Sequence, residues 1–155
     1  LRENIAFSFE RDYDIEEVYA AAKKSGVYDD IMDFKDGFDT VIGERGVTLS
    51  GGQKQRVSIA RALIKNPSLL VLDDSLSAVD TNTEKSILEA LDKINATEVI
   101  IAHRISTIKA CDEIIFLEDG HIKERGTHDE LVELDGEYNK MYQNQLLEDE
   151  LKGGF

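Results

Sequence analysis

Two adjacent glycines follow a serine near the middle of the chain, in a segment made of Leu49, Ser50, Gly51, Gly52 and Gln53. Glycines at the start of a helix let backbone N–H groups approach a ligand without interference from a Cβ atom, and Ser50 adds a hydroxyl donor. A helix N-terminus also carries partial positive charge. The segment therefore predicts a cradle for phosphate. An ordinary helix cap followed by two spacer glycines is the alternative that these residues alone leave open.

Acidic side chains follow a second distinctive segment, the apolar run 69–72, which ends in Asp73 and Asp74. Ligands of α/β proteins bind at the carboxyl ends of strands. Two carboxylates there would let one hold Mg²⁺ while the next polarises a water for phosphoryl transfer. Two exposed acids in a turn are the alternative interpretation.

A histidine, His103, follows another apolar run, residues 98–102. If both runs are parallel strands, His103 lies at the same sheet edge as the two aspartates. A lone histidine has a structural role more often than a catalytic one, and the sequence pattern leaves both open.

The elements that must position these residues alternate between helix and strand. Ser50 and Gln53 have the spacing of a capping box, and an apolar stripe follows at helical spacing until Pro67, formed by Val57, Ala60, Leu63 and Ile64. Residues 69–72 and 98–102 are predicted as strands buried on both faces. A helix over 81–95, opened by a capping box of Thr81 and Glu84, would lie between them. This order predicts a parallel sheet in an α/β domain.

Local signals also predict the elements at the two ends of the chain. The first third predicts a helix opened by a capping box at Asp14 and closed by Gly26, a short helix over 27–34 and a loop over 35–46. The last third predicts a hairpin of strands 113–117 and 121–125 around a type I′ turn. After the hairpin, the last third also predicts a short helix capped by Thr127 and a terminal helix over 137–150.

Charge is distributed unevenly along the 155 residues. The chain holds 18 Lys and Arg against 32 Asp and Glu, a formal net charge of -14. Residues 1–48 and 111–155 carry net charges of -6 and -9, whereas residues 49–110 carry +1. The acid excess argues against non-specific binding to nucleic acid or anionic lipid. The near-neutral centre is the place to expect an anionic ligand, unless the acidic flanks are merely solvated surface.

Composition narrows the class of protein further. With 41% hydrophobic residues the chain can bury a core, and its length suggests about one domain. A single cysteine, Cys111, fits a reducing, cytosolic setting. The sequence has no apolar run of the roughly 18 to 20 residues that span a bilayer and no signal-peptide pattern, so we expect a soluble chain.

Five motifs in order resemble those of the nucleotide-binding domain of ABC transporters. Residues 49–53, which we call the signature segment, resemble the LSGGQ signature, and residues 69–73 resemble the Walker B strand. Residues 77–80 resemble the D-loop, residues 101–104 the switch-histidine segment, and residues 126–131 a C-terminal stretch typical of exporters. The resemblance implies a P-loop NTPase-like α/β fold. It divides the chain into a helical signature subdomain, 1–66, and a part of the ATPase core, 67–155, with a parallel sheet, a C-terminal β-hairpin and helices.

The segment Thr-Val-Ile-Gly-Glu-Arg-Gly, residues 40–46, also resembles a family segment. In ABC exporters the similar segment meets the coupling helices of the transmembrane domain, and importer ATPases and chromosome-maintenance ATPases usually lack it. The resemblance thus favours an exporter that is contacted through Gly43–Gly46. Glu44 and Arg45 are the candidates for coupling, with plain surface charge as the alternative.

Two departures from the family pattern stand out. The chain contains no Gly-x-x-x-x-Gly-Lys-[Ser/Thr] loop, and residues 1–5 resemble the stretch just after the glutamine loop of the family. We therefore expect a C-terminal part of the domain, which by itself binds ATP poorly. In addition, Asp74 stands where most hydrolysing members have glutamate. Aspartate is shorter by one C–C bond, about 1.5 Å.

The resemblance implies a role for each candidate residue. Asp73 would position Mg²⁺ through water, Asp74 would address the attacking water, and His103 would contact the γ-phosphate. Asp80 would communicate across a dimer of nucleotide-binding domains. Ser50, Gly51, Gly52 and Gln53 would complete the site of the second domain, because two ATP molecules are sandwiched between the subunits in this family. An intact signature beside Asp74 suggests one subunit of a heterodimeric exporter at the cytoplasmic face of the cell membrane.

Two rival interpretations come from other classes. A non-enzymatic interaction or regulatory fragment would lack a strand that neighbours its sheet, and exposed strand edges favour self-association. A DNA-linked ATPase would share the signature, but it fits poorly with residues 43–46 and with the acidic flanks. The exported substrate is not encoded in these motifs.

Overall fold

The chain folds into two units, residues 1–101 and residues 102–155, in a computed structural model that describes residues 1–8, 11–43 and 46–153. The division into 1–66 and 67–155 expected from the motifs follows the subdomains of the family and stays a prediction. The candidate residues from Ser50 to Asp80 lie in the first unit, and His103 lies in the second.

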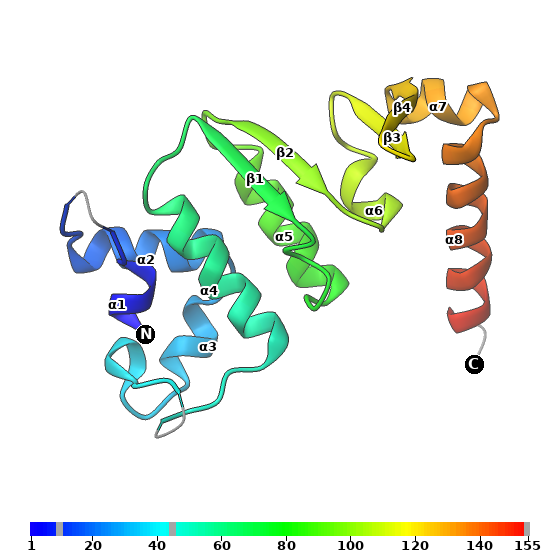
Figure 1. Cartoon of the computed structure of the whole chain (residues 1–155). Helices are drawn as coiled ribbons and strands as arrows, with labels where there is room; N and C mark the ends of the chain where they lie inside the picture. The colour runs from blue at the N-terminus through cyan, green and yellow to red at the C-terminus, as the bar shows by residue number, and fades with distance from the viewer. Residues whose placement is uncertain (9–10, 44–45, 154–155) are drawn as a thin grey trace. The chain divides into compact units, whose positions relative to one another are not determined.

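Helices dominate the first two thirds of the first unit, and a pair of strands follows (Figure 1). Its elements are α1 (Arg2–Ile5), α2 (Ile15–Lys24), α3 (Tyr28–Met32), a 3₁₀ turn η1 (Gly37–Asp39), α4 (Gly51–Leu63), β1 (Leu69–Asp73), α5 (Thr81–Leu91) and β2 (Thr97–Ile101). The turn η1 was not expected in the loop predicted over 35–46. A buried Phe38 anchors it against Tyr19 and Tyr28.

Helix α4 lies between two apolar clusters. Val57, Ala60 and Ile64 are buried among residues of α1 and α2, whereas Ile59 and Leu63 are buried with β1 and α5. The predicted stripe is therefore buried as expected, but Leu63 belongs to a second apolar face that periodicity alone did not separate. Because both faces of α4 are packed, the position of its first turn is fixed from two sides.

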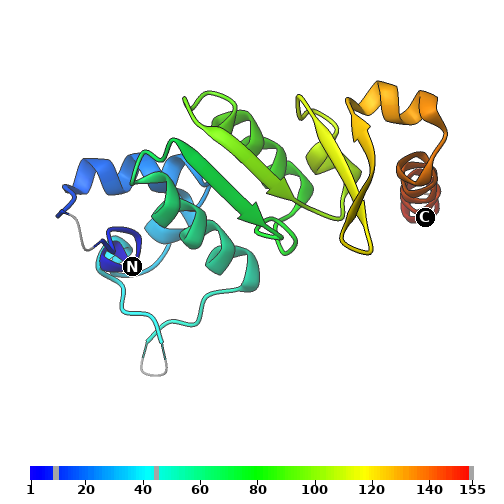
Figure 2. The same ribbon diagram turned by 45° about the horizontal axis from the view of Figure 1, so that its top comes forward.

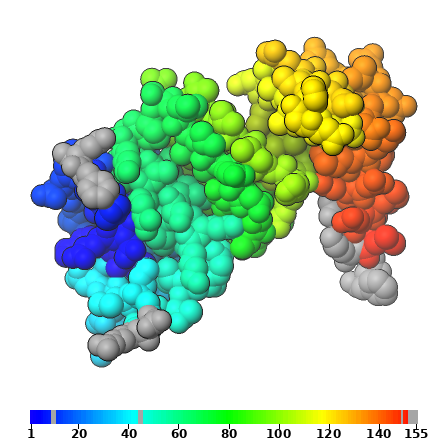
Figure 3. Space-filling model, in the orientation of Figure 1, coloured from blue at the N-terminus to red at the C-terminus, as the bar shows by residue number. Residues whose placement is uncertain are grey.

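Strands β1 and β2 pair in parallel, as predicted, with Val71 opposite Val99. The expectation that both faces of these strands are buried is wrong in this structure. Leu70 and Leu72 face α4 and α5, but every second residue is exposed, and Leu69, Val71, Val99 and Ile101 are between 44% and 55% exposed. Figure 2 shows both helices on one side of the two strands, and the space-filling view shows atoms of the strands at the surface (Figure 3). Within the described residues of the first unit, helices cover one face only.

The beginning of α5 differs from the predicted capping box. Asp80, not Thr81, is the N-cap, because its carboxylate accepts a hydrogen bond from the Thr83 N–H. Thr81 is instead the first helical residue, and Glu84 is buried at 2% exposure. The helix ends at Leu91, four residues earlier than expected.

The other local signals are confirmed. Asp14 with Glu17, Ser50 with Gln53 and Thr127 with Glu130 form complete capping boxes. Gly26 ends α2 with φ +67°, and the helix expected over 27–34 is the shorter α3. Each of these structures depends on residues within one turn of the chain, which is why the sequence predicts them well.

The second unit contains α6 (Ile105–Ile108), β3 (Ile114–Glu118), β4 (His121–Gly126), α7 (His128–Leu134) and α8 (Glu137–Gly153). Positive φ values at Asp119 and Gly120 confirm the type I′ turn of the hairpin. Ile105, Ile114, Leu131 and Tyr138 form its core. No helix within the described residues of the chain has the length and apolar character to cross a membrane.

Candidate functional site

The first turn of α4 is built as the sequence predicts. Ser50 Oγ accepts from the Gln53 N–H at 3.2 Å, and the Gln53 side chain accepts from the Ser50 N–H at 3.0 Å. These bonds satisfy two of the N–H groups at the helix start, those of Ser50 and Gln53, and helix geometry leaves those of Gly51 and Gly52 without an acceptor inside the helix. The two interpretations of this segment are therefore compatible, because the serine caps the helix while the glycine N–H groups stay available to an anion.

A carboxylate on α3 holds the side chains that follow the glycines. Asp30 accepts from Gln53 Nε2 at 2.9 Å and from two guanidinium nitrogens of Arg56 at 2.7 and 3.2 Å. The side chains of Arg56 and Asp30 are 13% and 27% exposed. Residues 53 and 56 share one face of the helix, so a single carboxylate orients that face.

The opposite face of the first turn meets residues 74–80, which we call the post-β1 loop. Gln55 Nε2 donates to the Asp74 carbonyl at 3.2 Å and to Ser77 Oγ at 2.9 Å, and Gln55 Oε1 accepts from the Ala78 N–H at 2.9 Å. A Cβ atom on Gly52 would lie 2.7 Å from the Ala78 carbonyl oxygen. Gly52 is thus required by a close approach within this chain, a reason for glycine that the motif did not reveal.

Asp73 and Asp74 lie at the carboxyl end of β1, and both are exposed. Asp74 has φ +47°, a conformation that aspartate tolerates better than most residues. Its N–H donates to the Ile101 carbonyl at 3.0 Å, which continues the pairing of β1 with β2 by one residue. The backbone of Asp74 is therefore fixed by β2 on one side and by Gln55 on the other.

Asp80 ends the post-β1 loop and caps α5. Hydrogen bonds from the side chain and the backbone of Thr83 lower the pKa of Asp80 below its ordinary value of 3.8. The carboxylate is consequently ionised at neutral pH, and it is exposed at the end of the loop that begins with Asp74.

His103 is exposed and belongs to the second unit, so its juxtaposition with Asp74 stays a prediction. Within its own unit, the backbone around it is held by Gln145 of α8. Gln145 donates to the His103 carbonyl and accepts from the Ile105 N–H at 2.8 Å. No local pattern predicts this contact, which joins residues 42 positions apart.

The segment predicted to meet the coupling helices is described only in part, since Glu44 and Arg45 lie outside the described residues. Gly43 has φ +125°, and the Gly46 N–H donates to the Gly43 carbonyl at 3.0 Å. A Cβ atom on Gly46 would collide with the Val41 carbonyl, so this position requires glycine. Val41 is 72% exposed beside this turn.

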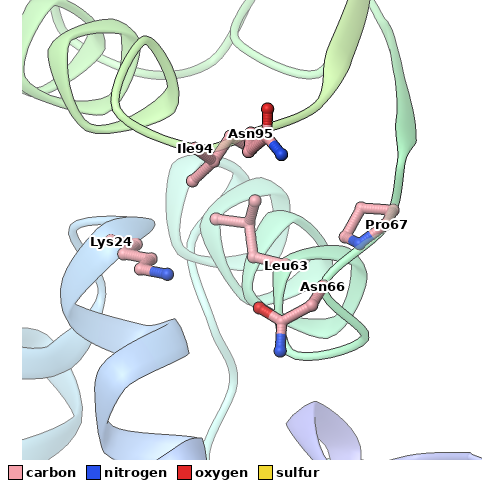
Figure 4. Close-up of a pocket in the computed structure, with 6 residues that line it drawn as sticks. All are labelled: Lys24, Leu63, Asn66, Pro67, Ile94 and Asn95. Atoms are coloured by element: carbon pink, nitrogen blue, oxygen red, sulfur yellow. The ribbon is translucent and has the colours of Figure 1, made fainter.

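A hollow of about 160 Å³ lies at the other end of α4, lined by Lys24, Leu63, Asn66, Pro67, Ile94 and Asn95 (Figure 4). A helix of 13 residues is roughly 20 Å long, so this hollow is well removed from the first turn. Ligand pockets usually measure about 300–1,000 Å³. The hollow is too small to compete with the first turn as a candidate site.

The carboxylates fit a magnesium site of one particular kind. Within the described residues no group of three or more His, Cys, Asp or Glu side chains could enclose a metal. Mg²⁺ in nucleotide sites is usually held by one or two carboxylates together with phosphate oxygens and waters. Asp73 and Asp74 provide such a donor set, which depends on a nucleotide for the remaining ligands.

Comparisons with known proteins agree with these features. The family model described as ABC transporter matches residues 2–77. The ABC transporter ATP-binding protein YknU of Bacillus subtilis is 51% identical over 147 residues, which cover 94% of this chain and 25% of that protein. An ATP-dependent lipid A-core flippase of Photorhabdus laumondii is 48% identical over 145 residues, covering 92% of this chain and 25% of that protein.

A solved structure gives the same result. The structure of a bacterial Atm1-family ABC exporter with ATP bound has a TM-score of 0.86 and 44% identity, covering 94% of this chain and 26% of that one. The chain spans about a quarter of the length of the curated relatives it matches. The motifs in order, the fold and these similarities lead to one conclusion: the chain belongs to the family of ABC transporter nucleotide-binding domains.

Proposed function

We propose that this chain acts as part of the ATP-binding and ATP-hydrolysing component of an ABC exporter, where it couples the binding and hydrolysis of MgATP to transmembrane export. The observation that carries the proposal is the first turn of α4, whose glycines pack against the loop that begins with Asp74. The relatives named as an ABC transporter ATP-binding protein and as a lipid A-core flippase support it. In the intact transporter this component lies at the cytoplasmic face of the cell membrane.

The signature segment serves the nucleotide site of a second nucleotide-binding domain. The N–H groups of Gly51 and Gly52 and the partial charge of the helix N-terminus bind an anion there. Ser50 and Gln53 hold each other in the capping box, and Asp30 holds Gln53, so the first turn is preorganised for that ligand. Contact with the transmembrane domain is made through Gly43–Gly46.

The chain's own site is formed by Asp73, Asp74 and His103. Asp73 is the residue that holds Mg²⁺ through water, and Asp74 orients the attacking water. ATP supplies the phosphoryl group when it is bound. His103 contacts the γ-phosphate, and Asp80, ionised at the end of the post-β1 loop, communicates with the second domain. The lysine-bearing phosphate loop of the family does not occur in these 155 residues.

Asp74 makes this site the slower one of the pair. A carboxylate shorter by about 1.5 Å reaches the attacking water poorly, and general-base assistance is worth about 10²–10⁴-fold in rate. An intact signature segment beside a degenerate catalytic position is the pattern of a heterodimeric exporter, in which one site hydrolyses ATP and the other mainly binds it.

The test compares two substitutions in the intact transporter that carries these residues. Asp74→Glu restores the reach of the carboxylate, and because the second site already hydrolyses ATP, it should raise the total rate of ATP hydrolysis to about 2-fold that of the unmodified transporter. Asp74→Asn is the matched control, because asparagine also tolerates the positive φ at this position but provides no carboxylate. Equal rates for the unmodified transporter and Asp74→Glu, with both folded by thermal melting, would show that Asp74 does not limit this site.

A second candidate function is favoured by the exposed face of β1 and β2. A chain that leaves apolar side chains of a parallel sheet open to solvent could act as a non-enzymatic module that associates with another copy. This alternative needs neither ATP nor Asp74, and the oligomeric state of the chain tests it.

A further inference from the structure

Gln55 uses its whole amide group to hold the post-β1 loop. Its Nε2 donates to the Asp74 carbonyl and Ser77 Oγ, and its Oε1 accepts from the Ala78 N–H. A carbonyl can only accept and a backbone N–H can only donate, so these partners determine the orientation of the amide. One side chain of α4 thereby connects both ends of the turn between residues 74 and 78.

The glycines of the signature segment lie on the same face of α4 as Gln55. Gly51 and Gly52 precede it by four and three residues, which places them one helical turn away. A Cβ atom would lie 3.5 Å from the Ala78 Cβ if added to Gly51, and 2.7 Å from the Ala78 carbonyl oxygen if added to Gly52. The backbone of the first turn and the loop are therefore in direct contact, and Figures 1 and 2 both place the loop beside the beginning of α4.

Neither of the joined pieces can shift freely on its own. Asp30 holds the other face of the first turn through Gln53 and Arg56. The loop is fixed at its beginning by the Asp74 N–H bond to β2 and at its end by the cap of α5. A displacement of the first turn must therefore be transmitted to the Asp74 carbonyl through Gln55, or it must break the three hydrogen bonds of that side chain.

We infer that Gln55 is a positioning residue that couples the two nucleotide sites through one subunit. The inference rests on the proposed function, in which the first turn of α4 serves the nucleotide of the second domain and Asp74 serves the chain's own. Binding at the second domain's site adds a further constraint on the first turn, and Gln55 passes that constraint to the backbone of Asp74. The two sites then bind ATP with positive cooperativity.

The experiment measures ATP hydrolysis against ATP concentration in the intact transporter. Gln55→Leu keeps the approximate size of the side chain and removes all three hydrogen bonds, whereas Gln55→Glu keeps an acceptor for Ala78 and removes both donors. Lys54→Leu is the matched control, since Lys54 is the exposed neighbour on the same helix. Thermal melting establishes that each variant is folded.

We expect the unmodified transporter and Lys54→Leu to show a Hill coefficient between 1 and about 2. Gln55→Leu should reduce it to about 1 and lower the apparent ATP affinity by about 5- to 50-fold, with Gln55→Glu intermediate. A merely structural defect would lower the active fraction and leave the Hill coefficient unchanged. A Hill coefficient of 1 in the unmodified transporter, or one above 1 that survives Gln55→Leu, would overturn the coupling. Absence of any ATP hydrolysis in the unmodified transporter would instead contradict the proposed function.

Discussion

Two neighbouring glycines, Gly51 and Gly52, meet the post-β1 loop at different distances, and this difference gives a prediction at the scale of single residues. A methyl group on Gly52 would lie 2.7 Å from a backbone oxygen of Ala78, which must then move. We expect Gly52→Ala to lower the free energy of unfolding by about 1–3 kcal/mol, the usual cost of overpacking. Urea denaturation of the 155-residue chain, followed by circular dichroism, measures it.

Gly51→Ala is the matched control for that substitution. Its Cβ would lie 3.5 Å from the Ala78 Cβ, an ordinary contact, and alanine is favoured over glycine in helices by up to about 1 kcal/mol. Its stability should therefore equal or exceed that of the unmodified chain. If Gly52→Ala proves as stable as Gly51→Ala, the loop does not press on the helix as described.

At the scale of elements, Asp30 joins α3 to the first two turns of α4. Its carboxylate accepts bonds from Gln53 and Arg56 in a partly buried setting. Asp30→Asn removes the charge and one of the acceptors, and we expect it to lower the free energy of unfolding by about 1–2 kcal/mol. The measurement is again the urea midpoint.

Asp29→Asn provides the control for Asp30→Asn, because Asp29 carries the same charge one position earlier in α3 and is exposed. Surface substitutions of this kind usually change stability by no more than about 0.5 kcal/mol. Equal midpoints for the two variants would mean that α3 does not hold α4 through this carboxylate.

The range of each interaction along the chain determined what could be predicted. The cap at Ser50 and the turn at Gly120 depend on adjacent residues, and both are confirmed. The cap of α5 was assigned to Thr81 because the motif fits there as well, and only the carboxylate of Asp80 decides it. The contacts of Gln55 with the post-β1 loop join residues about twenty positions apart, and no local pattern encodes them.

The exposed face of the sheet shows a second limit on what the sequence can predict, because burial depends on what covers a strand. A continuous apolar strand predicts burial on both faces only if something covers both. Within the first unit α4 and α5 cover the face of Leu70 and Leu72, whereas its described residues leave the face of Val71 and Val99 open. The apolar sequence of a strand indicates that both faces favour burial, and the structure shows which face is exposed.

At the scale of the whole molecule, this open face predicts self-association of the 155-residue chain. Leu69, Val71, Val99 and Ile101 form one apolar patch across β1 and β2, and the parallel register places Val71 opposite Val99. Contiguous apolar surface and free strand edges both favour pairing with a second copy. Sedimentation velocity over a range of concentrations should show a mass that rises above that of the monomer.

Charge placed in the centre of the patch should abolish this association. The double variant Val71→Lys with Val99→Lys puts two ammonium groups opposite each other on the open face, where they repel a second copy and one another. Ser58→Lys with Ser86→Lys adds the same charge at exposed helical positions and should associate like the unmodified chain. If the unmodified chain sediments as a monomer at every concentration, the open face does not recruit a second copy, and the non-enzymatic alternative loses its support. If both double variants are monomeric, total charge rather than the patch governs the association.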